Sequence, residues 1–287
     1  MKYIFTADWH IRSDNPICRV DDFLDIQKKI LLQIRDIAFK ENACILVAGD
    51  IFDKARIEPY FEIMLIDIFK RCEMYVVAGN HELLYHRLDN IDKSSLGVLI
   101  RQDNWTLLQT SSNHCFDTFK GFSYGENIEN GKNLVLLHKY CEMYNLPDYI
   151  ENGITAEYLC NNYDYDIFVT GDNHHSFVYA KKNKIVFNPG CITRQNVNLK
   201  KYQPVIFLYD STLMKYEKIQ LLDNDIEAID DSYLKIKKQR DERVELFLNK
   251  LNIAGNMDVD FISNLRKFLK SNSINQKTRD KIWEIVN

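Results

Sequence analysis

The chain has 287 residues, of which 46% are hydrophobic and 12% aromatic, so it can bury a large core and is not intrinsically disordered. Its seven cysteines are scattered without C-x-x-C spacing, which argues against a zinc ribbon or a disulfide framework and predicts reduced thiols. The formal net charge is -4, and the 228 residues before Ile229 carry 25 Lys and Arg against 32 Asp and Glu, so this part has too few cations to grip nucleic acid mainly through a basic face.

The amino terminus and the apolar runs argue against a membrane protein. No stretch of about 18 uncharged apolar residues occurs. Asp8 and His10 stand where a signal peptide would need apolar side chains. We therefore expect a soluble, cytoplasmic protein with no membrane partner.

In chain order, the first predicted elements are strands that alternate with helices. KYIFTADWH at residues 2–10 is a buried strand, and apolar side chains then recur at helical spacing from Phe23 to Ile37. CILVAGDIFD at 44–53 is a second strand, followed by a helix that opens near Pro59, and MYVVAGNHE at 74–82 is a third. This alternation predicts an α/β fold with parallel strands, whose ligand crevice lies beyond the carboxyl ends of the strands.

Polar side chains follow each predicted strand, and two later apolar runs, NLVLLHKY and DIFVTGDNHH, end in the same way. The strand-end groups are Asp8 and His10, Asp50 and Asp53, Asn80 and His81, His138, and Asp172 and His174. Five separate turns that each happen to carry such a group are far less expected than one shared metal site. Oxygen and imidazole donors without cysteine suit manganese, magnesium, iron or zinc. Two such ions about 3.5–4 Å apart can bind both the attacking and the leaving oxygen of a phosphoryl transfer. The residues predict a two-metal phosphoesterase.

The motif order D-x-H, G-D-x-x-D, G-N-H-E, a lone His and G-x-x-H, over residues 8 to 174, resembles the calcineurin-like metallophosphoesterase superfamily. The resemblance implies a four-layer α/β fold, in which two mixed β-sheets are sandwiched between helices. It implies two divalent cations, most simply Mn²⁺ with Mg²⁺ as the alternative. The implied ligands are Asp8, His10, Asp50 and His174 for one metal, and Asp50, Asn80, His138 and Asp172 for the other.

The resemblance also assigns roles around these ligands. His81 would be the general acid or transition-state stabiliser, beside Asp50 as the ligand shared by both metals. Asp53 and Glu82 would orient the neighbouring histidines. The family usually has G-H-x-H where this chain has Gly171 to His174, so Asp172 replaces a histidine. Asp172 either binds the second metal and favours harder ions, which we prefer, or points away and leaves that metal weakly held.

FNPGCITRQN at 187–196 resembles the nuclease branch of the superfamily, the SbcD-like subunit of DNA repair and recombination complexes. The G-D-N-H variant resembles phage-encoded versions, which would act in the host cytoplasm. Arg194 would contact a substrate phosphate, and a surface salt bridge is the alternative. The predicted function is a two-metal DNA exonuclease or endonuclease.

Two regions are predicted: a nuclease domain at 1–226 and a helical carboxyl-terminal region at 227–287. A helix should open near residues 230–232 and present apolar side chains up to Leu251, and two shorter helical patterns follow. The resemblance implies that this region binds an SMC-like coiled-coil ATPase, a separate chain because no G-x-x-x-x-G-K-[ST] occurs here, and that the protein is a homodimer. The alternative is that these helices pack on their own body.

Two other functions stay open. One is a stand-alone phosphodiesterase or phosphatase on small nucleotides. The other is a DNA-end-binding scaffold in which Asp172 has impaired catalysis.

Overall fold

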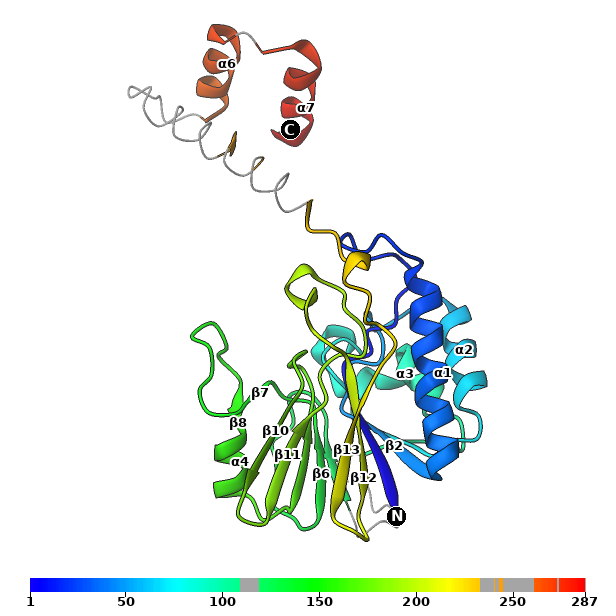
Figure 1. Ribbon diagram of the computed structural model, residues 1–287. Helices are drawn as coiled ribbons and strands as arrows, with labels where there is room; N and C mark the ends of the chain where they lie inside the picture. The colour runs from blue at the N-terminus through cyan, green and yellow to red at the C-terminus, as the bar shows by residue number, and fades with distance from the viewer. Residues whose placement is uncertain (109–118, 233–239, 241–242, 245–260, 273, 287) are drawn as a thin grey trace. The chain divides into compact units, whose positions relative to one another are not determined.

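The computed structural model describes residues 1–287 except 109–118, 233–239, 241–242, 245–260, 273 and 287 (Figure 1). The chain divides into two compact units, Met1–Asp230 and Asp231–Asn287. Within the described part of the chain, none of the helices combines the length and the apolar character that a membrane span requires.

The first unit contains two large sheets. The strands of the first sheet are β1 (Lys2–Thr6), β2 (Ala43–Val47), β3 (Met74–Val76), β4 (Trp105–Leu107), β12 (Val205–Asp210) and β13 (Lys215–Gln220). Their order is β13-β12-β1-β2-β3-β4. Strands β1 to β4 are parallel, whereas β12 runs antiparallel to β1 and forms a hairpin with β13.

The second sheet is also mixed. Its strands are β5 (Phe119–Phe122), β6 (Leu134–Leu137), β9 (Ile167–Thr170), β10 (Phe177–Lys181) and β11 (Lys184–Asn188). Their order is β10-β11-β9-β6-β5, and only β10 is antiparallel to its neighbour. The short strands β7 (Cys141–Glu142) and β8 (Ile154–Thr155) form a separate parallel pair.

Helices cover the outer faces of the sheets. They are α1 (Phe23–Glu41), α2 (Pro59–Phe69), α3 (Ser95–Leu99) and α4 (Ala156–Asn162), with 3₁₀ turns η1 (Leu84–His86), η2 (Leu88–Lys93), η3 (Val197–Leu199) and η4 (Ile226–Ala228). Helix α1 begins where the Asp22 side chain accepts the N–H of Asp25, and it ends at Asn42 in a left-handed conformation. Pro59 occupies the first position of α2, as predicted from its missing N–H.

Three apolar clusters hold the layers together. One lies between the sheets and includes Phe5, Leu46, Leu136 and Phe187. A second packs α1, α2 and α3 on the first sheet, and a third packs α4 on the second. Figure 1 shows α1 to α3 on one outer side and α4 on the other. The predicted four-layer architecture is confirmed, and it places the carboxyl ends of the parallel strands at one edge.

The second unit contains the helices α6 (Phe261–Ser271) and α7 (Gln276–Val286). Leu265 and Leu269 of α6 are buried, and the guanidinium of Arg266 lies 5.7 Å from the ring centroid of Trp283 on α7. These helices are the two short helical patterns expected near the carboxyl terminus. Most of the helix expected before them, up to Leu251, falls outside the described residues.

Candidate metal centre

The backbone after β1 and β2 adopts an uncommon conformation. Asp8, His10 and Asp50 have φ angles of 50°, 45° and 52°, and a non-glycine residue in such a sparsely populated region costs about 1–3 kcal/mol. Hydrogen bonds hold the two segments in register: the N–H of Asp8 donates to the Gly49 carbonyl over 3.1 Å, and that of His10 to the Asp50 carbonyl over 2.9 Å. Strain concentrated on three polar residues at one sheet edge marks this edge as a functional site.

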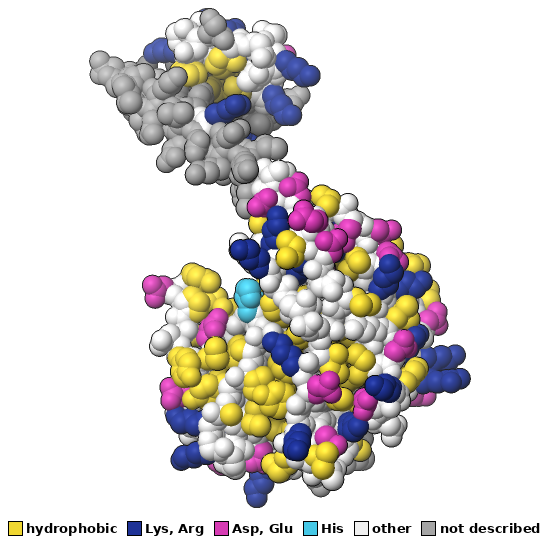
Figure 2. Space-filling view, viewed as in Figure 1, with side chains coloured by type: hydrophobic (Ala, Val, Ile, Leu, Met, Phe, Trp, Pro, Cys, Tyr) yellow, Lys and Arg dark blue, Asp and Glu magenta, His cyan; other side chains and the backbone are white. Residues whose placement is uncertain are grey.

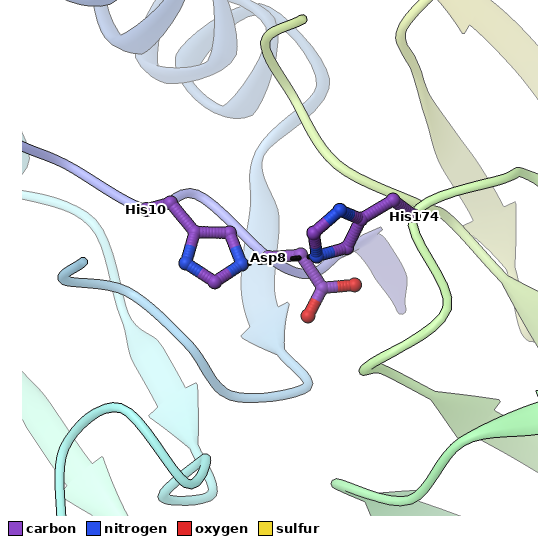
Figure 3. Close-up of side chains that lie close together, drawn as sticks. All are labelled: Asp8, His10 and His174. Atoms are coloured by element: carbon purple, nitrogen blue, oxygen red, sulfur yellow. Dashed lines mark hydrogen bonds between the residues drawn. The ribbon is translucent and has the colours of Figure 1, made fainter. Parts of the chain in front are cut away.

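The first group of potential ligands consists of Asp8, His10 and His174, which each place one ligand atom within 4.8 Å of the others (Figure 3). Nε2 of His10 and Nε2 of His174 lie 3.1 Å apart. Oδ2 of Asp8 is buried and has no hydrogen-bond partner among the described residues. Two imidazole nitrogens and an orphaned carboxylate oxygen in so small a space are costly to bury unless a cation lies between them, so this donor set fits a divalent metal.

The second group joins Asp8 and Asp50 to His138. Oδ2 of Asp50 lies 3.7 Å from Nε2 of His10 and 3.5 Å from Nε2 of His138, so it stands between the two groups. Nε2 of His138 is also 3.1 Å from Oδ1 of Asn80. The structure thus brings together six of the seven predicted ligand residues, Asp8, His10, Asp50, Asn80, His138 and His174, and metal binding by each stays a prediction.

His138 is held so that one particular nitrogen faces the site. Its Nδ1 donates a hydrogen bond to the Ala48 carbonyl over 2.7 Å, which leaves Nε2 to bind a metal. The ring fits only because residue 49 is glycine. Gly49 has a φ of 87°, and a Cβ at this position would lie 2.2 Å from Nδ1 of His138.

Asp172 contributes to the centre through its backbone. Its N–H donates to Oδ1 of Asp8 over 2.9 Å, which ties the segment after β9 to the segment after β1. Asp172 also lines a pocket of about 570 Å³ together with His138. Asp172 belongs to none of the three groups of potential ligands found among the described residues, so metal binding by its carboxylate stays a prediction.

His81 lies at the edge of the centre, with its ring centroid 4.6 Å from that of His10. Its Nδ1 is 2.7 Å from the carbonyl oxygen of Asp53. Because a carbonyl only accepts, Nδ1 carries the hydrogen and Nε2 is the atom that can exchange a proton with a substrate. The Asp53 carboxylate also lies 4.0 Å from Nδ1 of His10, so Asp53 contacts both histidines, and the three residues form the third group of potential ligands.

Glu82 plays a different part from the one expected. Its buried carboxylate accepts hydrogen bonds from the backbone N–H groups of Asp50, Phe52 and Gly79, at 3.0, 2.9 and 2.8 Å. The predicted role of orienting a histidine is therefore corrected: Glu82 turns inward and holds the strained backbone around Asp50. Burial, followed by the charge of Asp50, raises the pKa of Glu82 to about 7.

Arg194 also requires a correction. It is 1% exposed, and its guanidinium donates to the carboxylate of Asp223 and to the carbonyls of Lys200 and Asp225. Asp223 is shared with a second buried guanidinium, that of Arg19. A side chain buried in this way offers no face to a substrate phosphate and is no surface salt bridge. The buried ion pair of Arg194 with Asp223 instead stabilises the segment that follows β11.

Sequence reasoning missed Asn188, which supports the turn that carries Asp172 and His174. Its Nδ2 donates to the carbonyls of Asn173 and His175 over 2.6 and 2.8 Å, and its Oδ1 accepts from the Thr170 hydroxyl over 2.8 Å. The sequence feature that could have indicated this role is an asparagine at the end of a strand, directly before Pro189 and Gly190. Gly190 then allows close approach, because it has a φ of 73° and its Cβ would lie 2.6 Å from the His174 carbonyl.

The charges of the centre favour a cation. Burial raises the pKa of Asp8 well above its usual value, and burial lowers the pKa of His10 to about 3 against the opposing charge of Asp50. Burial alone would lower the pKa of His138, but the carboxylates of Asp50, Asp8 and Asp172 raise it to about 9. Buried carboxylates that hold a proton on a neighbouring imidazole are equally able to hold a metal in its place.

Comparisons with known proteins give two similar solved structures and one matching family model. The chain is similar in structure to an archaeal phosphodiesterase, with 15% identity and a TM-score of 0.44, over 77% of this chain and 100% of that chain. It is also similar to a Vps29 double mutant from Entamoeba histolytica, with 15% identity and a TM-score of 0.35, over 77% of this chain and 99% of that chain. No curated protein matches it. Residues 1–176, which include every predicted metal ligand, match the family model described as calcineurin-like phosphoesterase, and the chain therefore belongs to that family.

Proposed function

We propose that the chain is a metal-dependent nuclease that hydrolyses phosphodiester bonds in DNA. Metal-dependent phosphoester hydrolysis is the chemistry that the family and the donor set support. The choice of a DNA diester as the substrate is the proposal.

The observation that carries it is the free space on two sides of the centre. On one side lies the pocket of about 570 Å³ that His138 lines. On the other side His10, His81 and His174 line a groove of about 160 Å³, which shares Arg12 and Asp53 with a depression of about 330 Å³. A phosphodiester carries a substituent on each side of its phosphorus, whereas a monoester carries one.

The depression offers three basic side chains where a nucleic acid strand would continue, and three acidic side chains balance their charge. Lys54 and Arg56 line it and are exposed, beside Arg12. Backbone phosphates are the usual partners of such side chains, and Asp14, Asp53 and Glu58 in the same depression limit the attraction. This arrangement supports a short contact with the strand rather than a long basic track.

Each residue of the centre has a chemical task in this proposal. When bound, two divalent cations would supply Lewis-acid stabilisation of the phosphoryl group and would lower the pKa of the attacking water. The predicted ligands would hold the cations in place: Asp8, His10, Asp50, Asn80, His138, Asp172 and His174. His81, with Nδ1 fixed by the Asp53 carbonyl, gives a proton from Nε2 to the departing sugar oxygen.

The test is cleavage of linear DNA by the purified chain with Mn²⁺, compared with its His81→Ala and Asp172→His variants. We expect cleavage by the parent, a loss of about 10²- to 10⁴-fold in His81→Ala, and retained cleavage in Asp172→His. His175→Ala is the matched control, because His175 is exposed and its ring stacks edge-on against Tyr202. It should cleave as the parent does.

Other outcomes would favour the alternatives. Hydrolysis of small nucleotide diesters without any DNA cleavage would favour a stand-alone phosphodiesterase. DNA binding without cleavage, with cleavage appearing in Asp172→His, would favour an end-binding scaffold whose second metal site is disabled by the aspartate.

We also propose that the carboxyl-terminal helices recruit an SMC-like coiled-coil ATPase and that the chain forms a homodimer. The apolar residues at helical spacing in this region and the resemblance of residues 187–196 to SbcD-like subunits support the proposal. Stimulation of cleavage by ATP in the presence of such an ATPase, lost when residues 231–287 are removed, would support it. Light scattering of the purified chain measures the dimer directly.

A further inference from the structure

The pocket on the His138 side has features that the metal chemistry does not use. Two loops form its walls: the segment after β5, with Tyr124, and the segment between β7 and β8, with Tyr149. His138, Tyr140 and Asp172 line it as well, so the pocket is continuous with the metal centre. Its volume of about 570 Å³ is within the range of about 300–1,000 Å³ typical of small-ligand sites.

We propose that this pocket binds the unpaired nucleobase of the nucleotide next to the scissile phosphate. The inference rests on the proposed function, since it assumes a substrate that carries bases. The phosphate lies at the metal centre, and the attached base enters between the loops and stacks on Tyr149.

The aromatic side chains point to a planar occupant. Tyr149 is 79% exposed and Tyr124 is 36% exposed, although both line the pocket. Figure 1 shows the loop between β7 and β8 standing clear of the sheets, and in Figure 2 hydrophobic side chains gather on this loop. Exposed tyrosines beside a phosphate-binding centre are the arrangement on which single-stranded nucleic acids stack their bases.

The charge of the lining points to a neutral occupant. Glu126, Glu151 and Asp172 contribute three carboxylates, whereas Lys139 is the one Lys or Arg among the residues that line the pocket, which His138 lines as a predicted metal ligand. This imbalance disfavours a second phosphate group in the pocket. A nucleobase carries no charge at neutral pH, and its amino and imino groups can donate to such oxygens.

The pocket therefore selects an unpaired base. In a duplex both faces of an internal base are stacked on its neighbours, so the base enters only after it leaves the helix. We expect the enzyme to prefer single strands and frayed ends to the interior of a duplex.

The experiment compares two chromogenic diesters with the same leaving group, thymidine 5′-(p-nitrophenyl phosphate) and its analogue in which hydrogen replaces the base. The parent chain with Mn²⁺ should show a higher kcat/KM for the thymidine diester. In Tyr149→Ala the ratio of the two kcat/KM values should fall by about 5- to 150-fold, the range expected for one lost base stack. Tyr149→Phe should keep the ratio, and so should Tyr158→Ala, because Tyr158 is an exposed tyrosine on α4 outside the pocket.

Equal losses on both diesters in Tyr149→Ala, or an unchanged ratio, would overturn the base pocket. If the chain hydrolyses neither diester, calorimetry with Mn²⁺ still decides: thymidine 5′-monophosphate must bind more tightly than deoxyribose 5-phosphate, and Tyr149→Ala must remove the difference. A chain that discriminates bases but leaves DNA intact would refute the nuclease proposal and keep the pocket.

Discussion

The substitution Asn188→Ala tests how the turn after β9 is held in place. The Asn188 side chain is fully buried and makes three hydrogen bonds, two of them to the carbonyls of Asn173 and His175. Without the amide, the carbonyl of the buried Asn173 loses a partner at a cost of about 1–3 kcal/mol, and the half-buried bond to His175 adds roughly 1 kcal/mol. The free energy of unfolding should fall by about 2–4 kcal/mol, a large part of the roughly 5–15 kcal/mol typical of a domain.

The same substitution should weaken metal binding, because the turn carries His174. Loss of a residue that orients a metal ligand costs about 10- to 100-fold in affinity. We would measure urea unfolding of the metal-free protein and Mn²⁺ binding by calorimetry, with Asn162→Ala as the control. Asn162 donates the same kind of bond, from Nδ2 to the Tyr158 carbonyl over 2.8 Å, but is exposed at the end of α4. If both variants unfold and bind Mn²⁺ alike, the supporting role of Asn188 is refuted.

Two further predictions concern buried charge. Asp223→Ala leaves the guanidiniums of Arg19 and Arg194 buried without their shared carboxylate and should lower the free energy of unfolding by about 3–5 kcal/mol. The exposed ion pair of Asp36 with Arg35 provides the control, since Asp36→Ala should lower the free energy of unfolding by at most about 1 kcal/mol. Comparable thermal midpoints for Asp223→Ala and Asp36→Ala would contradict the reasoning. The pKa of His138, raised to about 9 in the metal-free protein, means that its proton stabilises the fold fully below about pH 6.5 and that this contribution is lost as the pH rises through 9. Mn²⁺ must displace this proton, so binding near pH 7.5 should release about one proton and tighten with pH up to about 9. Calorimetry in two buffers of different ionisation enthalpy measures the release, and identical heats would argue against it.

The sequence by itself determined the centre in outline. Asp8, Asp50 and His138 each follow an apolar strand, and parallel strands end at one edge whatever the details of their packing. The helical spacing of apolar side chains from Phe23 to Ile37 also identified α1, because helical periodicity is a local property of the chain.

The tertiary structure alone decided the partners of the polar groups around that centre. Arg194 binds Asp223, which lies beyond β13, and Glu82 binds the backbone of the strand-end turn at Asp50. Asn188 supports a turn that begins after a different strand. A buried donor or acceptor must find a partner, but which group it finds depends on how distant segments are packed, and no local pattern of residues encodes that packing.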